Sequence, residues 1–203
     1  MNAHGEHDHD QAENEHDHGG EQSQHGTGMY LRFAAMILTG MVVMYAVMFV
    51  GSWELTHVRY SQSRVFMALT MGGAMGLVML GWMLNMYRSA KANVAVVVAS
   101  LLLLGGGAFL DRSQTTVGDT AFMNGMIPHH SLAITRSERA QLSDVRVCEL
   151  AVEISEAQRR EIFEMEWLID DIRRNGEAET PEEAQARPVP DYEEPAERQC
   201  VTE

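Results

Sequence analysis

The stretch VFMALTMGGAMGLVMLGWMLNMY (residues 65–87) contains no charged residue, and Thr70 and Asn85 are its only polar members apart from the hydroxyl group of Tyr87. About 20 apolar residues in a helix cross the hydrocarbon core of a bilayer. Two shorter uncharged runs lie at 33–50 and 94–110. Within a membrane region of residues 29–111, we therefore expect an all-α arrangement of three transmembrane helices in contact with the lipid bilayer. Their expected bounds are about residues 31–52, 65–87 and 92–110.

The charge of the chain is concentrated at its two ends. The net charge is −14, from 15 basic and 29 acidic residues. Residues 1–28 hold seven acidic and no basic residues, and residues 176–203 hold nine acidic and two basic ones. This balance argues against a nucleic-acid partner. The polar composition of both ends predicts disordered acidic tails.

The orientation of the three spans depends on their loops. The loop 88–91 would share one side of the membrane with the N-terminal tail, and everything after Leu110 would lie on the other side. Basic residues near the span ends are equally numerous on the two sides, with Arg32, Arg88 and Lys91 against Arg59, Arg64 and Arg112. Short loops weigh most in the positive-inside rule, so Arg88 and Lys91 favour an inside N-terminus. We expect a multi-pass protein of the plasma (inner) membrane whose C-terminal domain lies on the outer, extracytoplasmic side.

The two cysteines give little indication of a covalent framework. Cys148 lies in a predicted helix and Cys200 in the C-terminal tail. Two cysteines so placed do not resemble a disulfide scaffold. We expect Cys148 to be a small buried side chain and Cys200 an unpaired thiol.

The N-terminal tail holds six of the nine histidines, with two copies of Glu-His-Asp-His at 6–9 and 15–18. Imidazoles and carboxylates at this spacing bind divalent ions such as Cu²⁺, Zn²⁺ or Ni²⁺. The alternative is a solubilising acidic tail whose histidines bind metal only incidentally.

The apolar run 65–87 contains a row of methionines spaced four residues apart: Met67, Met71, Met75, Met79 and Met83. Such steps keep the row on one broad helical face. Thioethers bind soft ions such as Cu(I) and Ag(I). Methionine also fills gaps between packed helices, which explains the row more simply.

Capping residues and apolar spacing predict two further helices after the spans. Asp119 supplies an N-cap for a helix over residues 119–139. Asp144 caps a second helix, residues 145–174, which ends before Gly176. The apolar residues of the second helix keep the three- and four-residue spacing of an amphipathic helix. Two such helices form an antiparallel hairpin.

Methionines and histidines gather on the first helix of this hairpin. Met123, Met126 and His130 are three and four residues apart and share one face. His129 lies one turn from Met126, and Pro128 loosens the preceding turn. Two thioethers and two imidazoles within about two turns are donors for Cu(I), Ag(I) or, with harder ligands, Cu(II).

The second helix of the hairpin offers further groups at the same spacing, namely Gln158, Glu161 and Met165. These side chains could ligate an ion or support the residues that do. The alternative is a pair of helices that pack through their methionines and carry surface histidines.

These residues resemble the family called domain of unknown function 305. Its hallmark is an Asp followed by Phe-Met-x-x-Met-Ile-x-His-His-x-x-Ala-Ile, and then Leu-Ala-x-x-Ile and Gln-x-x-Glu-Ile-x-x-Met. The chain matches this pattern over 119–134 and 150–165. The resemblance implies a ferritin-like helical hairpin over residues 118–175. Membrane-bound members with three helices ahead of the domain are similar to residues 29–174.

The resemblance also implies metal binding. Soluble members of the family are export-compartment proteins that bind copper or silver and are linked to metal tolerance. The implied principal ligands are Met123, Met126, His129 and His130, and the implied supporting residues are Met165, Glu161 and Asp119.

Two departures from the family pattern bear on this expectation. Leu132 and Arg136 stand where soluble members often carry extra methionines, which argues against loading with many soft ions. The motif occurs once, whereas fuller members hold it twice and build a four-helix bundle. A two-helix hairpin buries little by itself, so we expect it to form a homodimer or to pack on the membrane helices.

We therefore expect an integral membrane protein, not an enzyme, that binds copper, as Cu(I) or Cu(II), or silver. Its role would be metal homeostasis or tolerance, with hand-over to a metal-handling partner protein. A metal-free membrane scaffold whose hairpin docks a partner is the alternative. A third hypothesis is an oxidase that uses Glu54 and His57, because Glu-x-x-His is the unit of di-iron bundles.

Overall fold

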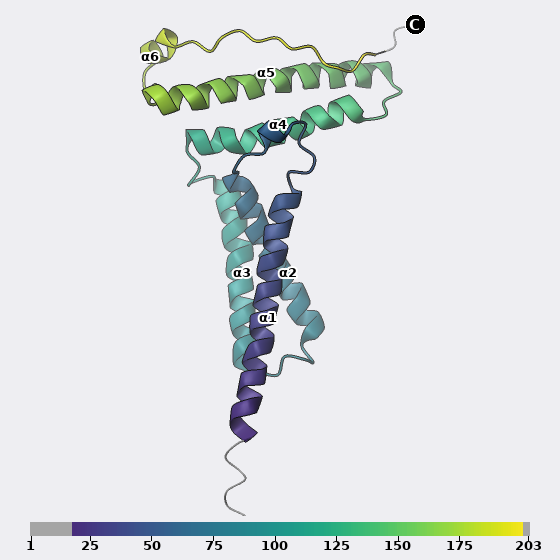
Figure 1. Cartoon of the computed structure of the whole chain (residues 1–203), viewed down its shortest axis with the longest axis vertical. Coiled ribbons are helices and arrows are strands. Elements are labelled where there is room, and N and C mark those ends of the chain that lie inside the picture. Colours follow the sequence, from purple (N-terminus) through teal and green to yellow (C-terminus); the bar gives the residue numbers. More distant parts are fainter. Residues whose placement is uncertain (1–17, 201–203) are drawn as a thin grey trace, which may run out of the picture.

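The computed structural model describes residues 18–200, which contain α-helices, one short 3-10 helix and no strand. In chain order the elements are α1 (His18–Val47), η1 (Leu55–His57), α2 (Gln62–Met83), α3 (Ala90–Ser113), α4 (Asp119–Arg139), α5 (Val145–Asn175) and α6 (Pro181–Ala186). Figure 1 shows α1, α2 and α3 side by side as an upright bundle, with α4 and α5 lying across one end of it. The all-α prediction is confirmed for the described residues. The expectations for residues 1–17 and 201–203 lie outside them.

The three apolar runs form the upright bundle. Gly28–Val47, Gln62–Met83 and Ala90–Ser113 are each long and apolar enough to cross a membrane. The prediction of three such helices is confirmed, although their bounds shift by a few residues. Helix α1 begins at His18, so the last part of the expected N-terminal tail belongs to a helix.

Glycine allows α2 and α3 to pack closely. A Cβ atom at Gly73 of α2 would lie 2.4 Å from the backbone oxygen of Ser100 and 2.5 Å from the backbone nitrogen of Leu104, both on α3. A Cβ atom at Gly107 of α3 would lie 2.8 Å from the backbone oxygen of Phe66 on α2. The two backbones therefore touch where only a residue without a side chain fits.

Helix α1 packs against α2 through methionines instead. The cluster between them includes Met29 and Met41 of α1 and Met75, Met79 and Met83 of α2. The remaining members of the α2 row, Met67 and Met71, are exposed. The row thus divides between a helix interface and the outer surface, as gap-filling methionines do.

The hairpin has the predicted helices. Its core consists of Met123, Ile127, Ile134, Ile162 and Met165. The carboxylate of Asp144 accepts the backbone N–H of Arg146, which confirms this residue as the N-cap of α5. The N-cap of α4 is Gly118, not Asp119, and Asp119 is the first residue of the helix.

The loop 48–61 fixes the hairpin to the bundle. The fully buried hydroxyl oxygen of Ser131 on α4 accepts the backbone N–H of Trp53 at 2.7 Å and lies 2.9 Å from Nδ1 of His57. The guanidinium group of Arg64, in the first turn of α2, donates to the backbone oxygen of Pro128 at 3.3 Å. The hairpin therefore packs on the membrane helices, one of the two arrangements that the sequence left open.

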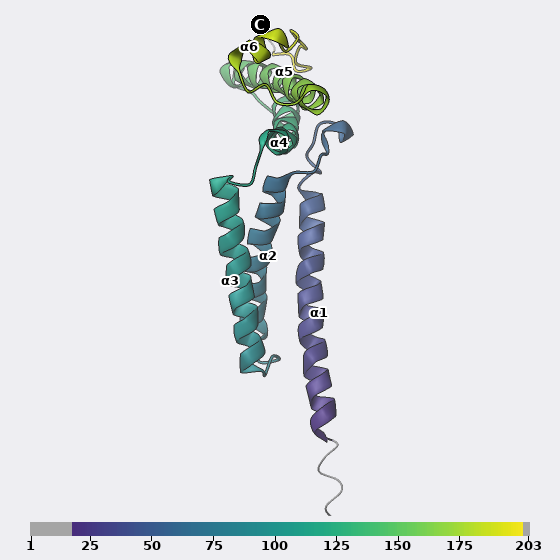
Figure 2. The same ribbon diagram turned by 90° about the vertical axis from the view of Figure 1, so that its left-hand side faces the viewer.

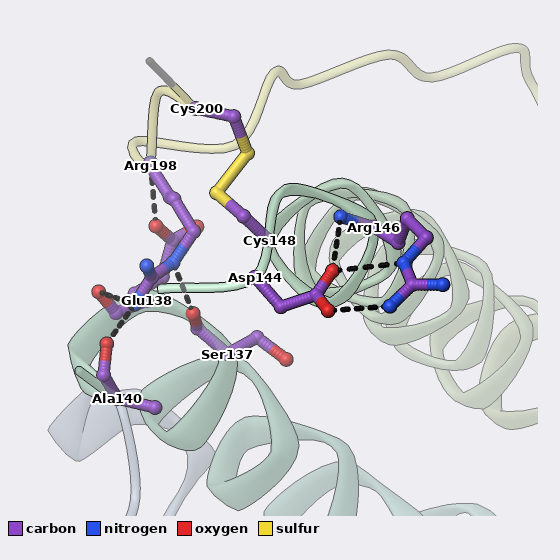
Figure 3. Close-up of a disulfide and its surroundings, with 8 residues drawn as sticks. All are labelled: Ser137, Glu138, Ala140, Asp144, Arg146, Cys148, Arg198 and Cys200. Atoms are coloured by element: carbon purple, nitrogen blue, oxygen red, sulfur yellow. Dashed lines mark hydrogen bonds and ion pairs between the residues drawn. A yellow bond between two sulfur atoms is a disulfide. The ribbon is translucent and has the colours of Figure 1, made fainter. Parts of the chain in front are cut away.

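The C-terminal segment, residues 176–200, runs back along α5 and includes α6 (Figure 1). We call this segment the C-terminal strap. A disulfide joins Cys148 of α5 to Cys200 (Figure 3), and the ring of Tyr192 stacks on Phe163 with 4.3 Å between centroids. An ion pair of 2.5 Å joins Arg187 to Asp171.

The expectations of an unpaired Cys200 and of a disordered tail are therefore wrong for residues 176–200. The contacts that hold the strap join residues far apart in the sequence; the disulfide alone spans 52 positions. Composition and local periodicity contain no signal for such contacts.

Replacing Gly73 with Ala should push α2 away from α3, because the added methyl group has no space beside the α3 backbone. We expect the free energy of unfolding in detergent to fall by about 1–3 kcal/mol, the usual cost of overpacking. Thermal or denaturant unfolding measures it. Gly81→Ala, on the same helix, is the matched control because a Cβ atom there meets nothing within 4 Å. Equal loss of stability in both variants would contradict the close packing.

Candidate functional site

His130 lies near the middle of α4, and its ring is held by the helix backbone. The side chain is mostly buried, and Nδ1 lies 2.9 Å from the backbone oxygen of Met126, one turn earlier. A carbonyl oxygen only accepts hydrogen bonds, so Nδ1 carries a proton and donates it. Nε2 is consequently the ring nitrogen whose lone pair is free when the imidazole is neutral.

Nε2 of His130 faces a carboxylate on α5. The distance from Nε2 to Oε2 of Glu161 is 2.7 Å, and the Glu161 side chain is 42% exposed. Nε2 of Gln158 donates to the same carboxylate oxygen at 3.3 Å. A chain of polar contacts thus runs from the α4 backbone through His130 and Glu161 to Gln158, and it crosses between the two helices.

The three predicted methionine ligands belong to the hairpin core or pack against it. Met123 and Met165 are buried in the hairpin core, and Met126 is half-buried and packs against the same core. The thioethers therefore lie among aliphatic side chains between α4 and α5. This position suits packing. Along the helices, Met126 lies one turn before His130 and Met165 one turn after Glu161.

The remaining two predicted ligands lie apart from the pair. His129 is exposed, and its ring centroid is 5.8 Å from that of His130 at an interplanar angle of 73°. Asp119 is exposed in the first turn of α4. It precedes His130 by eleven residues, about 16 Å along a helix axis. The structure therefore does not bring Asp119 to the site predicted from the motif.

A metal ion would need donors beyond the two contacting groups. In the part of the chain that the structure describes, no three His, Cys, Asp or Glu side chains gather in a way that could hold a metal ion. One imidazole nitrogen and one carboxylate oxygen meet between the helices, and Met126 and Met165 lie one helical turn from His130 and Glu161. Such a mixed set of harder and softer donors fits copper better than it fits Mg²⁺ or Ca²⁺.

The hairpin has two different faces. We call the side that carries Ser131 and Phe163 the covered face, because the loop 48–61 and the C-terminal strap pack there. His129 and Glu161 each precede these residues by two positions, which is about 200° around a helix. We call their side the open face. Figure 2 views the hairpin nearly end on, with η1 on one side of it.

A cavity of about 160 Å³ lies on the covered face and is lined by Trp53, Glu54, His57, Arg159, Glu166 and Glu194, among others. Two of its carboxylates have arginine partners. Glu166 pairs with Arg59 at 2.5 Å, and Glu194 pairs with Arg159 at 2.8 Å. The cavity therefore holds ion pairs in place of a free carboxylate cluster.

The same cavity contains both residues of the oxidase hypothesis. Nε2 of His57 is 3.9 Å from Oε2 of Glu54, and Nδ1 of His57 is engaged with Ser131. Both side chains lie on the covered face, across the hairpin from Glu161. A di-iron site needs a second Glu-x-x-His unit, and none is expected in a predicted helix; the residues Glu13 to His16, which have this spacing in the N-terminal tail, lie outside the described residues.

A buried arginine and a glutamate hold the C-terminal strap near the C-terminal end of α4. The guanidinium group of Arg159 is 3.5 Å from Oε1 of Glu138. Burial raises the pKa of Glu138, but hydrogen bonds from the Ser155 hydroxyl and from the backbone N–H groups of Glu197 and Arg198, together with Arg159, outweigh it and lower the pKa below its ordinary value.

Arg198 also closes the end of α4 (Figure 3). Its guanidinium group donates to the backbone oxygens of Ser137, Glu138 and Ala140, at 2.6, 2.9 and 2.5 Å. Cations stabilise the C-terminal ends of helices in this way. Sequence reasoning missed Arg198 because its partners lie about 60 positions away.

The chain belongs to the family described as "Domain of unknown function (DUF305)", which matches residues 112–200. The match includes the strap and both cysteines. The chain is also similar to the "Uncharacterized protein L153" of Acanthamoeba polyphaga mimivirus, at 34% identity over 104 residues, which are 48% of this chain and 68% of that protein. No solved structure matches the chain.

Low pH should weaken the attachment of the C-terminal strap to Glu138 of α4. Because the pKa of Glu138 is lowered in the folded protein, its contribution to stability is fully present above the ordinary pKa of about 4.3 and is lost as the pH falls through the lowered folded value. We expect hydrogen exchange at the amides of Glu197 and Arg198, corrected for the intrinsic rate, to accelerate as the pH falls from 5 to 3.

Glu138→Gln should give the accelerated exchange already at neutral pH, with a loss of about 1–3 kcal/mol for the charged hydrogen bonds. Glu182→Gln is the matched control, because Glu182 is exposed on α6 and forms no ion pair in the described chain. If the exchange rates of the Glu197 and Arg198 amides are the same in Glu138→Gln as in the parent chain, the Glu138 carboxylate does not hold the strap.

Proposed function

We propose that the hairpin of this membrane protein binds a copper ion, as Cu(I) or Cu(II), or a silver ion, at His130 and Glu161. One observation carries the proposal: Nδ1 of His130 is tied to the backbone oxygen of Met126, and Nε2 lies 2.7 Å from Glu161. In protein metal sites a hydrogen bond from one ring nitrogen to a carbonyl orients the other nitrogen toward the ion. A metal ion would replace the proton between Nε2 and the carboxylate.

The thioethers of Met123, Met126 and Met165 support the choice of metal. They are soft donors in or against the hairpin core, with Met126 one helical turn from His130 and Met165 one turn from Glu161, and thioethers favour Cu(I) and Ag(I). The partly exposed Glu161 leaves the ion within reach of a second protein. Binding and hand-over to a metal-handling partner, in metal homeostasis or tolerance, therefore fit the site better than catalytic turnover.

We further propose that the hairpin lies on the outer side of the plasma membrane. The support is the disulfide between Cys148 and Cys200, because disulfides persist in oxidising compartments and are rare in the cytosol. The end of the bundle away from the hairpin (Figure 1) holds Arg88 in the loop between α2 and α3 and Lys91 in the first turn of α3. Its basic residues suit the inner side.

The metal proposal predicts that one imidazole dominates ion binding. Six tail histidines (His4, His7, His9, His16, His18 and His25) are first replaced by Ala in the full chain, so that they do not mask the result. Competition with a chromophoric chelator then measures the affinity for Cu(I) and Ag(I). We expect His130→Ala and Glu161→Gln to weaken binding more than about tenfold, since they remove the two contacting donors.

Glu164→Gln is the matched control, because Glu164 lies on the same helix and pairs only with Arg160. Its affinity should equal that of the parent chain. If the parent chain binds neither ion more tightly than His130→Ala does, the metal proposal is wrong, and the metal-free scaffold takes its place.

The topology proposal predicts the activity of a reporter. Alkaline phosphatase needs its own disulfides, which form only in an oxidising compartment. Fused after Glu203 it should be active, and fused within the loop 88–91 it should be inactive. The reverse pattern would place the hairpin in the cytosol.

A further inference from the structure

The methionines of the membrane region are divided unevenly among its three helices. Helix α1 contains four methionines and α2 contains five, whereas α3, which is also long and apolar enough to cross a membrane, contains none. Valine and leucine occupy exposed positions of α3 instead, among them Val94, Val98, Leu101 and Leu102. Contact with lipid therefore does not explain why methionine is concentrated on α1 and α2, which pack against each other.

Two of these methionines reach from one helix to the backbone of the other. A Cβ atom at Gly72 of α2 would collide with Sδ of Met41 on α1. A Cβ atom at Gly40 of α1 would lie 2.8 Å from Cε and 3.6 Å from Sδ of Met75 on α2. Gly40 is next to Met41 in the sequence, and Gly72 is one turn from Met75. The two thioethers therefore cross between the helices within about one helical turn of each other. We call Met41 and Met75 the crossing pair.

Further thioethers lie along the same two helices. Met44 follows Met41 by three residues, Met79 follows Met75 by four, and both are half-buried. These spacings keep each residue on the face of its neighbour. Helices α1 and α2 run antiparallel (Figure 1), so Met44 lies toward the hairpin and Met79 lies away from it. The crossing pair thus has one more thioether about one turn away on each side.

The surroundings of the crossing pair restrict the charge of an ion that could bind there. Residues 33–50 and 65–87 contain no charged side chain, and a thioether is neutral. An ion inside a membrane costs free energy that grows with its charge. Thioethers are soft donors that select Cu(I), and Ag(I) has the same charge and a similar softness. The crossing pair therefore suits a soft monovalent cation better than Zn²⁺ or Cu²⁺.

We propose that α1 and α2 hold one soft monovalent cation, Cu(I) or Ag(I), between the thioethers of Met41 and Met75, with Met44 or Met79 as a third donor. Methionine has three rotatable side-chain bonds and adapts readily, so the sulfurs turn toward the ion without a shift of the two backbones. The ion joins α1 to α2 through sulfur–metal bonds, and its binding stabilises their packing.

This site is separate from the one in the hairpin. The crossing pair belongs to the membrane helices, whereas His130 and Glu161 belong to α4 and α5. The inference therefore goes beyond the proposed function and does not rest on it.

Native mass spectrometry of the full chain in detergent tests the proposal with Ag(I) as the probe. The starting variant has Ala in place of the six tail histidines and carries His130→Ala and Glu161→Gln, so that neither the tail nor the hairpin pair contributes. We expect Met41→Leu/Met75→Leu in this background to bind one Ag(I) fewer than the starting variant. Exchange of methionine for leucine conserves volume in a packed interface, so the helices keep their arrangement.

Met36→Leu/Met71→Leu is the matched control. It also replaces one methionine on α1 and one on α2, but these side chains are 42% and 46% exposed. The control should bind as many Ag(I) ions as the starting variant. An equal loss in the two double variants would show that the crossing pair does not hold the ion, and it would overturn the proposal.

X-ray absorption at the copper K edge provides a second measurement, with Cu(I) supplied to the starting variant at one ion per chain. We expect sulfur scatterers around the ion, and their signal should weaken in Met41→Leu/Met75→Leu. Methionines that only fill space between helices would leave the spectrum of this double variant equal to that of the starting variant.

The outcomes separate this inference from the proposed function. A starting variant that binds no Ag(I), or a Met41→Leu/Met75→Leu variant that binds as many ions as the starting variant, would overturn the membrane site and leave the hairpin site standing. If His130→Ala does not weaken binding in the chain with an intact Glu161, the proposed function fails and the membrane site stands.

Discussion

The buried hydroxyl group of Ser131 joins the hairpin to the membrane helices. It accepts the backbone N–H of Trp53 and contacts Nδ1 of His57. A buried polar group left without partners costs about 1–3 kcal/mol, so these contacts hold α4 in one rotational position against the loop. Arg64 adds a hydrogen bond to Pro128 three residues earlier on α4. The side of α4 that faces the loop is thereby fixed, and the opposite side stays open.

This rotational position determines what the site can do. With Ser131 against the loop, His129 is exposed, and His130 is directed toward Glu161 of α5. The methionines that share the motif pack between the helices. The open face therefore carries the exposed His129 and the partly exposed Glu161, the partner of His130. The proposed exchange of a soft ion depends on the partial exposure of Glu161 on this side of the hairpin.

The C-terminal strap closes the other side. Residues 176–200 cover the outer side of α5, cap the end of α4 through Arg198 and end at the disulfide to Cys148. The family match extends to residue 200, so the strap belongs to the matched family domain. A cross-link over 52 positions stabilises the folded state by about 4 kcal/mol in the chain-entropy description. It compensates for the small core of a two-helix domain.

The sequence by itself determined the helices and the faces that they carry. Apolar runs locate the three long helices, Asp144 locates the start of α5, and helical spacing puts Met123, Met126 and His130 near one another, because these signals act within a few turns. Tertiary structure alone decided the contact of His130 with Glu161, the bond of Cys148 with Cys200 and the exclusion of Asp119 from the site. Each of these depends on how separate segments pack, and the free energy of that packing comes from contacts between residues that local periodicity does not connect.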